Sequence, residues 1–222
     1  MPETENRLSI STGAGDVPAL FLRPEGATAL LVLAHGAGAG MEHPFMAGFA
    51  AGMYDAGVAT LRFDFPYRAA GRSFPDRPPV AIDAWRAAME SARGLAAGLP
   101  VFSAGKSFGG RMASMAVAEG METEGLVYLG YPLHAPGKPE KPRDAHLYGI
   151  TAPMLFLQGS RDPFALPGEL EPVVERIGAT ARLHWIEGGD HSFKVARSGR
   201  TPAEDGALAA VRAAEFIAAT AR

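Results

Sequence analysis

The sequence contains no cysteine, and this absence removes several kinds of chemistry. A chain without cysteine forms no disulfide, binds no metal through thiolates and has no cysteine nucleophile. A hydrophobic run long enough to cross a bilayer is also missing, since the longest strongly apolar run, residues 27–34, has the length of a buried strand. Residues 1–8 are polar and acidic and lack the basic and apolar segments of a signal peptide. We therefore expect a cytoplasmic protein with no membrane partner.

Long runs of one charge are missing as well. The chain has 21 Lys and Arg against 24 Asp and Glu, which gives a formal net charge of −3. Without a basic run, a nucleic-acid partner is not expected. The six histidines are scattered, with no pair at the spacing of metal ligands on a helix, so we expect neither a metal nor a cofactor.

What the sequence does contain is a regular alternation of strand and helix patterns. Short apolar segments predict strands, and longer segments with apolar residues three and four apart predict helices. The strands are expected at residues 17–23, 29–35, 58–63, 100–104, 125–131, 153–159 and 182–187, and the helices at 44–56, 80–97, 108–119 and 201–220. Such alternation predicts an α/β fold, with a mostly parallel sheet covered by helices on both faces. The length fits one such domain, residues 1–222.

One glycine-rich turn has the pattern of a nucleophile site. Residues 105–109, Gly-Lys-Ser-Phe-Gly, match the G-x-S-x-G nucleophile elbow between a predicted strand and a predicted helix. Small residues are needed on both sides of Ser107, because strand and helix cross closely there. The pattern predicts that Ser107 is a nucleophile; the alternative is a glycine turn with a surface serine.

Two further polar residues follow predicted strands, where parallel sheets form their sites. Asp162 comes after strand 153–159 and His191 after strand 182–187. Alone, an Asp-Pro turn is usually a helix cap, and a loop histidine is usually solvated. The order Ser, Asp, His is that of the α/β-hydrolase triad, so we predict His191 as general base and Asp162 as the acid that orients it. Asp190 is a less favourable acid because it adjoins His191 in the chain.

The loop after strand 29–35 is composed of small residues. It reads His-Gly-Ala-Gly-Ala-Gly over residues 35–40, which lets backbone approach a reacting carbonyl. We predict that the amides of Ala37 and Phe108 form an oxyanion hole, that Gly36 borders the substrate and that His35 supports the loop.

The spacing of the glycines in these loops does not match that of nucleotide-binding motifs. A dinucleotide fingerprint would need its third glycine at position 41 or 43, which are Met41 and His43. The Gly-Lys-Ser triplet at 105–107 would need a glycine at position 100, which is Pro100.

An aromatic loop follows strand 58–63. Phe65 and Tyr67 are predicted to line an acyl or leaving-group site, and the alternative is local packing. Arginines in and after this loop could attract an anionic substrate or could be solvated surface charges; these are Arg68, Arg72 and Arg77.

Together these motifs resemble the α/β-hydrolase superfamily, and in particular its small, lidless, dienelactone-hydrolase-like branch. Residues 130–134 through 136–141, with the motifs at 35–38, 64–67 and 109–111, are similar to a family of bacterial predicted hydrolases, a mammalian testis-expressed protein and a subunit of the non-specific-lethal chromatin complex. The resemblance implies a triad of Ser107, Asp162 and His191. Dienelactone hydrolases carry cysteine at the elbow, so lactone specificity is not implied.

The predicted function is that of a serine hydrolase. Only about 20 residues separate strands 125–131 and 153–159, too few for an independent lid, so we expect an open cleft suited to a small, soluble acyl substrate. The predicted reaction is cleavage of an ester, thioester or related acyl bond through an acyl-enzyme, most like a carboxylesterase (EC 3.1.1). The alternatives are a non-catalytic interaction module and a peptidase of the same fold.

Overall fold

The structure is a computed structural model that describes residues 5–221. Its strands are β1 (Asn6–Thr12), β2 (Gly15–Leu22), β3 (Ala29–Ala34), β4 (Val58–Phe63), β5 (Val101–Lys106), β6 (Leu126–Leu129), β7 (Met154–Gly159) and β8 (Ala181–Ile186). Its helices are α1 (Pro44–Asp55), α2 (Pro66–Ala69), α3 (Pro78–Ala96), α4 (Phe108–Ala118), α5 (Pro167–Ile177) and α6 (Pro202–Thr220), with a 3-10 helix, η1 (Ala145–Gly149).

All eight strands form one sheet in the order β1-β2-β4-β3-β5-β6-β7-β8. The pairs β1–β2 and β2–β4 are antiparallel, and every pair from β4 through β3 to β8 is parallel. The prediction of a mostly parallel α/β sheet is therefore confirmed. The carboxyl ends of β3, β5, β7 and β8 meet at one edge, where the loops that follow them come together.

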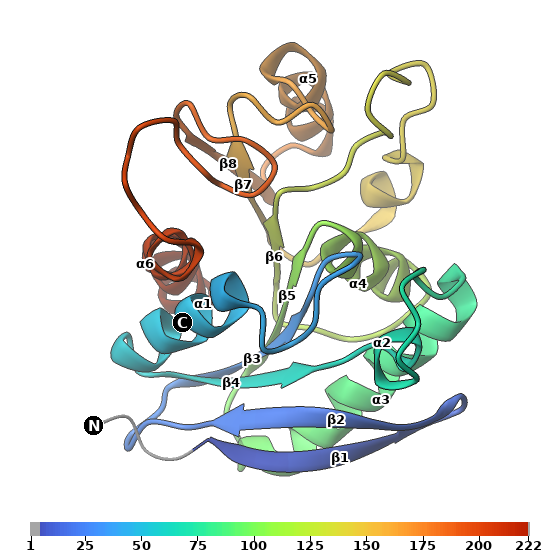
Figure 1. The fold of residues 1–222 in the computed structure, drawn as a ribbon, viewed down its shortest axis with the longest axis vertical. Helices are drawn as coiled ribbons and strands as arrows, with labels where there is room; N and C mark the ends of the chain where they lie inside the picture. Colours follow the sequence, from blue (N-terminus) through green and yellow to red (C-terminus); the bar gives the residue numbers. More distant parts are fainter. Residues whose placement is uncertain (1–4, 222) are drawn as a thin grey trace.

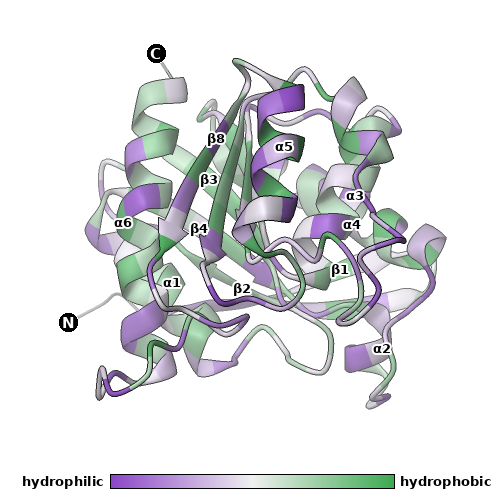
Figure 2. Cartoon of the chain, turned by 90° about the horizontal axis from the view of Figure 1, so that it is seen from above, coloured by the Kyte–Doolittle hydropathy of each residue, from purple (hydrophilic) through white to green (hydrophobic). Residues whose placement is uncertain are grey.

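Helices cover both faces of the sheet. Figure 1 shows α1 and α6 against one face and α3 and α4 against the other. Each face has its own core: Phe49 of α1 and Phe216 of α6 belong to one, and Trp85 of α3 and Met112 of α4 to the other. Figure 2 shows the central strands largely in the hydrophobic colour between these layers. Two buried faces explain why β3 is apolar at every position.

Four elements were not predicted from the sequence: β1, α2, α5 and η1. Strand β1 lies at the edge of the sheet and buries one residue fully, Ile10, so its apolar signal is weak. Helix α5 is rich in charge and buries Leu170 and Val173, two positions that form a short pattern. Both elements are stabilised by few buried residues, which left little hydrophobic periodicity to detect.

Residues 130–153 connect β6 to β7, and this segment is too short to form a separate lid domain. Of the helices and strands in the described chain, this segment holds η1 alone. The prediction that no lid domain is inserted is confirmed. Within residues 5–221, the helices include none with the length and hydrophobicity that a membrane span requires.

Candidate active site

Ser107 stands alone on the turn between β5 and α4. Its backbone angles are φ 48° and ψ −111°, a conformation that residues other than glycine rarely adopt. A Cβ atom on Gly105 would lie 2.2 Å from the nitrogen of Gly110, and one on Gly109 would lie 2.6 Å from the carbonyl oxygen of Ala34. The motif therefore has glycines because strand, turn and helix touch through their backbones.

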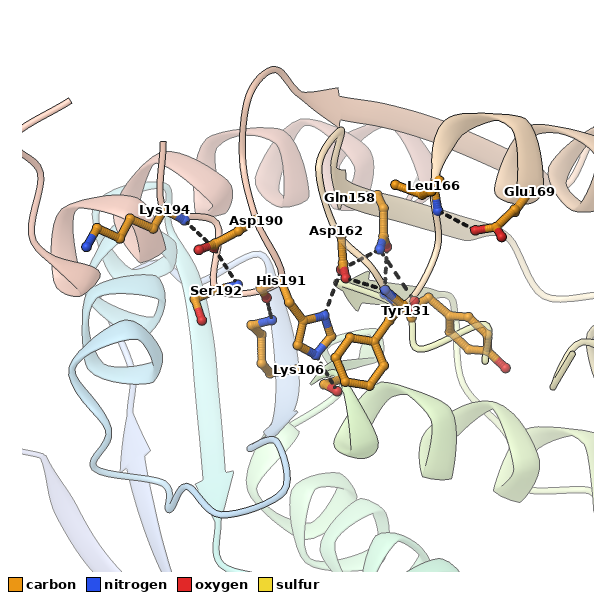
Figure 3. Close-up of polar contacts among 12 residues, drawn as sticks. Lys106, Tyr131, Gln158, Asp162, Leu166, Glu169, Asp190, His191, Ser192 and Lys194 are labelled. Carbon is orange, nitrogen blue, oxygen red and sulfur yellow. Dashed lines mark hydrogen bonds and ion pairs between the residues drawn. The ribbon is translucent and has the colours of Figure 1, made fainter. Parts of the chain in front are cut away.

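The structure brings the three predicted triad residues together. His191 Nε2 lies 2.8 Å from Ser107 Oγ, and His191 Nδ1 lies 2.7 Å from Asp162 Oδ2. Figure 3 shows the imidazole between the start of α4 and the buried carboxylate. Because Nδ1–H donates to Asp162, Nε2 carries the lone pair that can accept a proton from Ser107.

Asp162 is fully buried, and its carboxylate accepts three hydrogen bonds. Besides His191, Gln158 Nε2 donates to Oδ2 at 2.7 Å and the Phe164 amide donates to Oδ1 at 2.9 Å. The amide of Tyr131 donates to Gln158 Oε1 at 2.7 Å, which fixes the Gln158 side chain with its NH2 group toward the carboxylate. This environment stabilises a carboxylate and holds it in one orientation.

The alternative acid, Asp190, has a different role. Its Oδ1 accepts hydrogen bonds from the amides of Ser192, at 2.8 Å, and Lys194, at 3.0 Å. The carboxylate thus closes the turn that carries His191 (Figure 3).

Two side chains that the sequence did not single out hold His191 in place. The Phe164 ring stacks on the imidazole, with 4.1 Å between centroids. Lys106 Nζ donates a hydrogen bond to the His191 carbonyl and lies 4.8 Å from the centroid of the Phe193 ring. Burial lowers the pKa of Lys106 to about 8, against the opposing charges of Asp162 and Asp190. A lysine at the end of a buried strand was the one sequence signal for this contact.

The loop after β3 lies directly beside Ser107. A Cβ atom on Gly36 would lie 3.6 Å from the Cβ of Ser107. The amides of Ala37 and Phe108 make no hydrogen bond to any residue of the described chain, and Phe108 opens helix α4, where amides point toward an incoming anion. Both residues line the same cavity as Ser107.

His35 supports this loop from the core. It is fully buried, its Nδ1 lies 2.8 Å from the Gly36 carbonyl oxygen, and its Nε2 accepts the Phe65 amide hydrogen at 3.2 Å. Burial lowers the pKa of His35, so the ring is neutral near pH 7 and donates through Nδ1.

Phe65 and Tyr67 do not line the cavity that contains Ser107, so the prediction that they line an acyl or leaving-group site is wrong. Both are fully buried, with ring centroids 5.1 and 5.9 Å from the His35 ring. The Tyr67 amide donates to Asp76 Oδ2 at 2.7 Å, which fixes the chain after β4 with these rings facing the core. They pack behind the loop that follows β3, against His35. The arginines of this region are exposed outside the cavity: Arg68, Arg72 and Arg77.

A cavity of about 600 Å³ opens above Ser107. Its apolar wall comes from Phe45, Met46, Phe108, Pro132 and Phe164. Pro132 belongs to the segment 130–153, so the connection that replaces a lid forms one side of the cleft. The described residues include no group of three or more His, Asp or Glu side chains that could hold a metal ion.

A strained serine at the end of a central parallel strand, joined through a histidine to an acid two strands away, is the arrangement that defines the α/β-hydrolase fold. Residues 27–218 match the family model described as alpha/beta hydrolase domain. The chain therefore belongs to this family of α/β hydrolases.

Solved structures share the fold over nearly the whole chain. A dienelactone hydrolase from Anabaena variabilis has a TM-score of 0.77 and 24% identity, covering 100% of both chains. A serine hydrolase without a lid from Xanthomonas campestris has a TM-score of 0.75 and 18% identity, covering 96% of each chain. An esterase from Pyrococcus furiosus has a TM-score of 0.77 and 14% identity, covering 99% of this chain and 92% of that one. At these identities the likeness shows the fold.

Proposed function

We propose that this protein is a serine hydrolase that cleaves an ester, thioester or related acyl bond of a small soluble substrate, with carboxylesterase-like activity (EC 3.1.1). The observation that carries the proposal is the continuous chain of hydrogen bonds, at 2.8 and 2.7 Å, from Ser107 through His191 to Asp162. A serine is a weak nucleophile until a base accepts its proton, and this geometry supplies the base. Membership of the hydrolase family and the cavity above Ser107 support the same function.

The first half-reaction acylates Ser107. Its Oγ attacks the substrate carbonyl carbon as the hydroxyl proton passes to His191 Nε2, and Asp162 stabilises the resulting imidazolium. The carbonyl oxygen, now negative, accepts hydrogen bonds from the amides of Ala37 and Phe108. Collapse of this intermediate breaks the acyl bond, and the leaving alcohol or thiol takes the proton from His191.

The second half-reaction releases the acid. His191 removes a proton from water, which attacks the acyl-enzyme carbonyl, and the same two amides stabilise the second oxyanion. The proton then returns from His191 to Ser107 Oγ, and the carboxylic acid leaves. None of these steps requires a cofactor.

The cleft fits a small substrate. Its volume is about 600 Å³, within the range of small-molecule pockets, and the short segment 130–153 leaves it accessible. The structural neighbours include a dienelactone hydrolase and an esterase, and the activities of those proteins support acyl chemistry here. The sequence also resembles the family with testis-expressed and chromatin-complex members. For this reason a non-catalytic interaction module is the alternative function. Such a module has no need of an activated serine.

A substrate panel tests the proposed function. We expect turnover of p-nitrophenyl esters from acetate to octanoate, fastest for the short acyl chains, and no turnover of aminoacyl p-nitroanilides. Faster hydrolysis of the anilides would contradict the proposal in favour of a peptidase. Hydrolysis of no ester at any pH between 6 and 9 would contradict it in favour of an interaction module.

A further inference from the structure

Positive charge gathers around the cavity of a chain whose net charge is −3. The cationic side chains that line it are Lys106, Arg111, Arg143, Lys194 and Arg200, and among the described lining residues Asp205 is the one carboxylate. Asp205 is paired with Arg200 at 2.7 Å, and Lys106 donates to the His191 carbonyl. The remaining arginines, Arg111 and Arg143, need a separate explanation.

Arg111 is held close to the nucleophile with part of its charge buried. It lies one turn after Ser107 on α4, and its amide donates to the Ser107 carbonyl at 3.0 Å. Its Nε atom is buried and has no hydrogen-bond partner in residues 5–221. Burial and the neighbouring charge of Arg143 lower the pKa of Arg111. A guanidinium nitrogen buried without an acceptor is unfavourable unless a ligand supplies one.

Arg143 comes from the segment 130–153, but its backbone is fixed to the core. Its amide donates to the Leu133 carbonyl at 2.7 Å, and its carbonyl accepts the Tyr131 hydroxyl hydrogen at 2.7 Å. Tyr131 is itself buried. None of the ion pairs within residues 5–221 involves Arg143. The adjacent Asp144 accepts a hydrogen bond from the Tyr148 hydroxyl. The backbone of Arg143 is therefore held in place, and its side chain lines the cavity.

We infer that Arg111 and Arg143 together bind a carboxylate of the substrate, so that the enzyme acts on esters or thioesters carrying a free carboxylate group. Two neighbouring guanidinium groups repel each other, and a carboxylate between them removes the repulsion and supplies the missing acceptors. Both arginines line the cavity that contains Ser107, so one small molecule can contact the arginines and Ser107 at the same time. This inference rests on the proposed function and names its substrate class.

Matched substrate pairs test the inference. For the acyl side, we compare kcat/KM for 4-nitrophenyl hydrogen adipate and its methyl ester, which share chain and leaving group and differ in the free carboxylate. For the leaving-group side, we compare 4-acetoxybenzoate with its methyl ester. We expect the carboxylate form of one pair to be preferred by about ten- to a hundredfold, as one charge-assisted hydrogen-bonded pair provides, with a preference that falls as salt rises.

Substitutions of the two arginines test whether the preference for the carboxylate substrate depends on them. In Arg111→Met and Arg143→Met the ratio of kcat/KM values is expected to fall to near one, and Arg111→Lys, which keeps the charge without the planar fork, should retain part of it. Arg86→Met is the control, because Arg86 is an exposed residue of α3 that pairs with Glu119 away from the cavity. If Arg111→Met fails to fold, Arg143→Met and the salt dependence still decide the question.

The outcomes separate this inference from the proposed function. Hydrolysis of the neutral esters without a carboxylate preference in either pair would overturn the subsite and leave the serine hydrolase intact. A preference that survives in both Arg111→Met and Arg143→Met would also overturn it. Hydrolysis of no ester at all would contradict the proposed function first.

Discussion

Asp162→Asn is expected to lower kcat on the order of 10⁴-fold with little change in KM. The Asp162 carboxylate accepts hydrogens from His191 Nδ1, Gln158 Nε2 and the Phe164 amide. An amide cannot accept all three, because its NH2 group must face at least one of these donors. When the NH2 group faces His191, Nδ1 accepts its hydrogen, so the imidazole takes the other tautomer and Nε2 loses the lone pair that accepts the Ser107 proton. Steady-state kinetics on a p-nitrophenyl ester measure the effect.

Asp190→Asn is the matched control for this variant. The amide oxygen of an asparagine can still accept the hydrogens of the Ser192 and Lys194 amides, so the turn that carries His191 should persist. We expect most of the wild-type kcat to remain. The reverse result, a large loss in Asp190→Asn and a small one in Asp162→Asn, would show that the acid of the triad has been assigned to the wrong residue.

Gly105→Ala is expected to destabilise the fold by more than about 3 kcal/mol. The new Cβ atom would lie 2.2 Å from the Gly110 nitrogen and 2.3 Å from the Gly109 carbonyl carbon. These are backbone atoms, so no side-chain rotation can relieve the overlap, and α4 would have to separate from β5. In thermal unfolding followed by circular dichroism, this corresponds to a Tm decrease of about 10 °C.

Gly94→Ala is the control for the glycine substitution. Gly94 is an exposed position in α3, and a Cβ atom there would meet nothing within 4 Å. Alanine stabilises a helix more than glycine does. We therefore expect the free energy of unfolding of this variant to equal that of the wild type or to exceed it by about 0.5–1 kcal/mol. A wild-type Tm for Gly105→Ala would contradict the close strand-to-helix crossing on which the conformation of Ser107 depends.

The order of the parallel strands, and the loops that carry Ser107, Asp162 and His191, could be predicted from the sequence for physical reasons. Strands buried on both faces, such as 29–34, appear as uninterrupted apolar runs. A turn at which backbones touch admits glycine alone, and so residues 105–109 have a recognisable pattern. Polar residues directly after such strands are placed at one edge by the parallel topology itself.

The direction in which side chains point after a strand could not be predicted. Phe65 and Tyr67 would have the same sequence pattern in the cleft or in the core, and the contact that decides between them joins Tyr67 to Asp76. Arg143 lies in a segment without periodicity and reaches the cavity because Tyr131 and Leu133 hold its backbone. Lys106 and Phe164 hold His191 through contacts between distant parts of the chain. Such contacts follow from the assembled fold and have no local signature.

The central claim is that Ser107 is an activated nucleophile, and covalent labelling tests it most directly. Wild-type protein is treated with a fluorophosphonate probe, and the site of modification is identified by mass spectrometry of the digested protein. We expect a single adduct on Ser107, formed rapidly at pH 8, and no adduct on the folded Ser107→Ala variant. An unlabelled wild type, or equal labelling of wild type and variant, would contradict it.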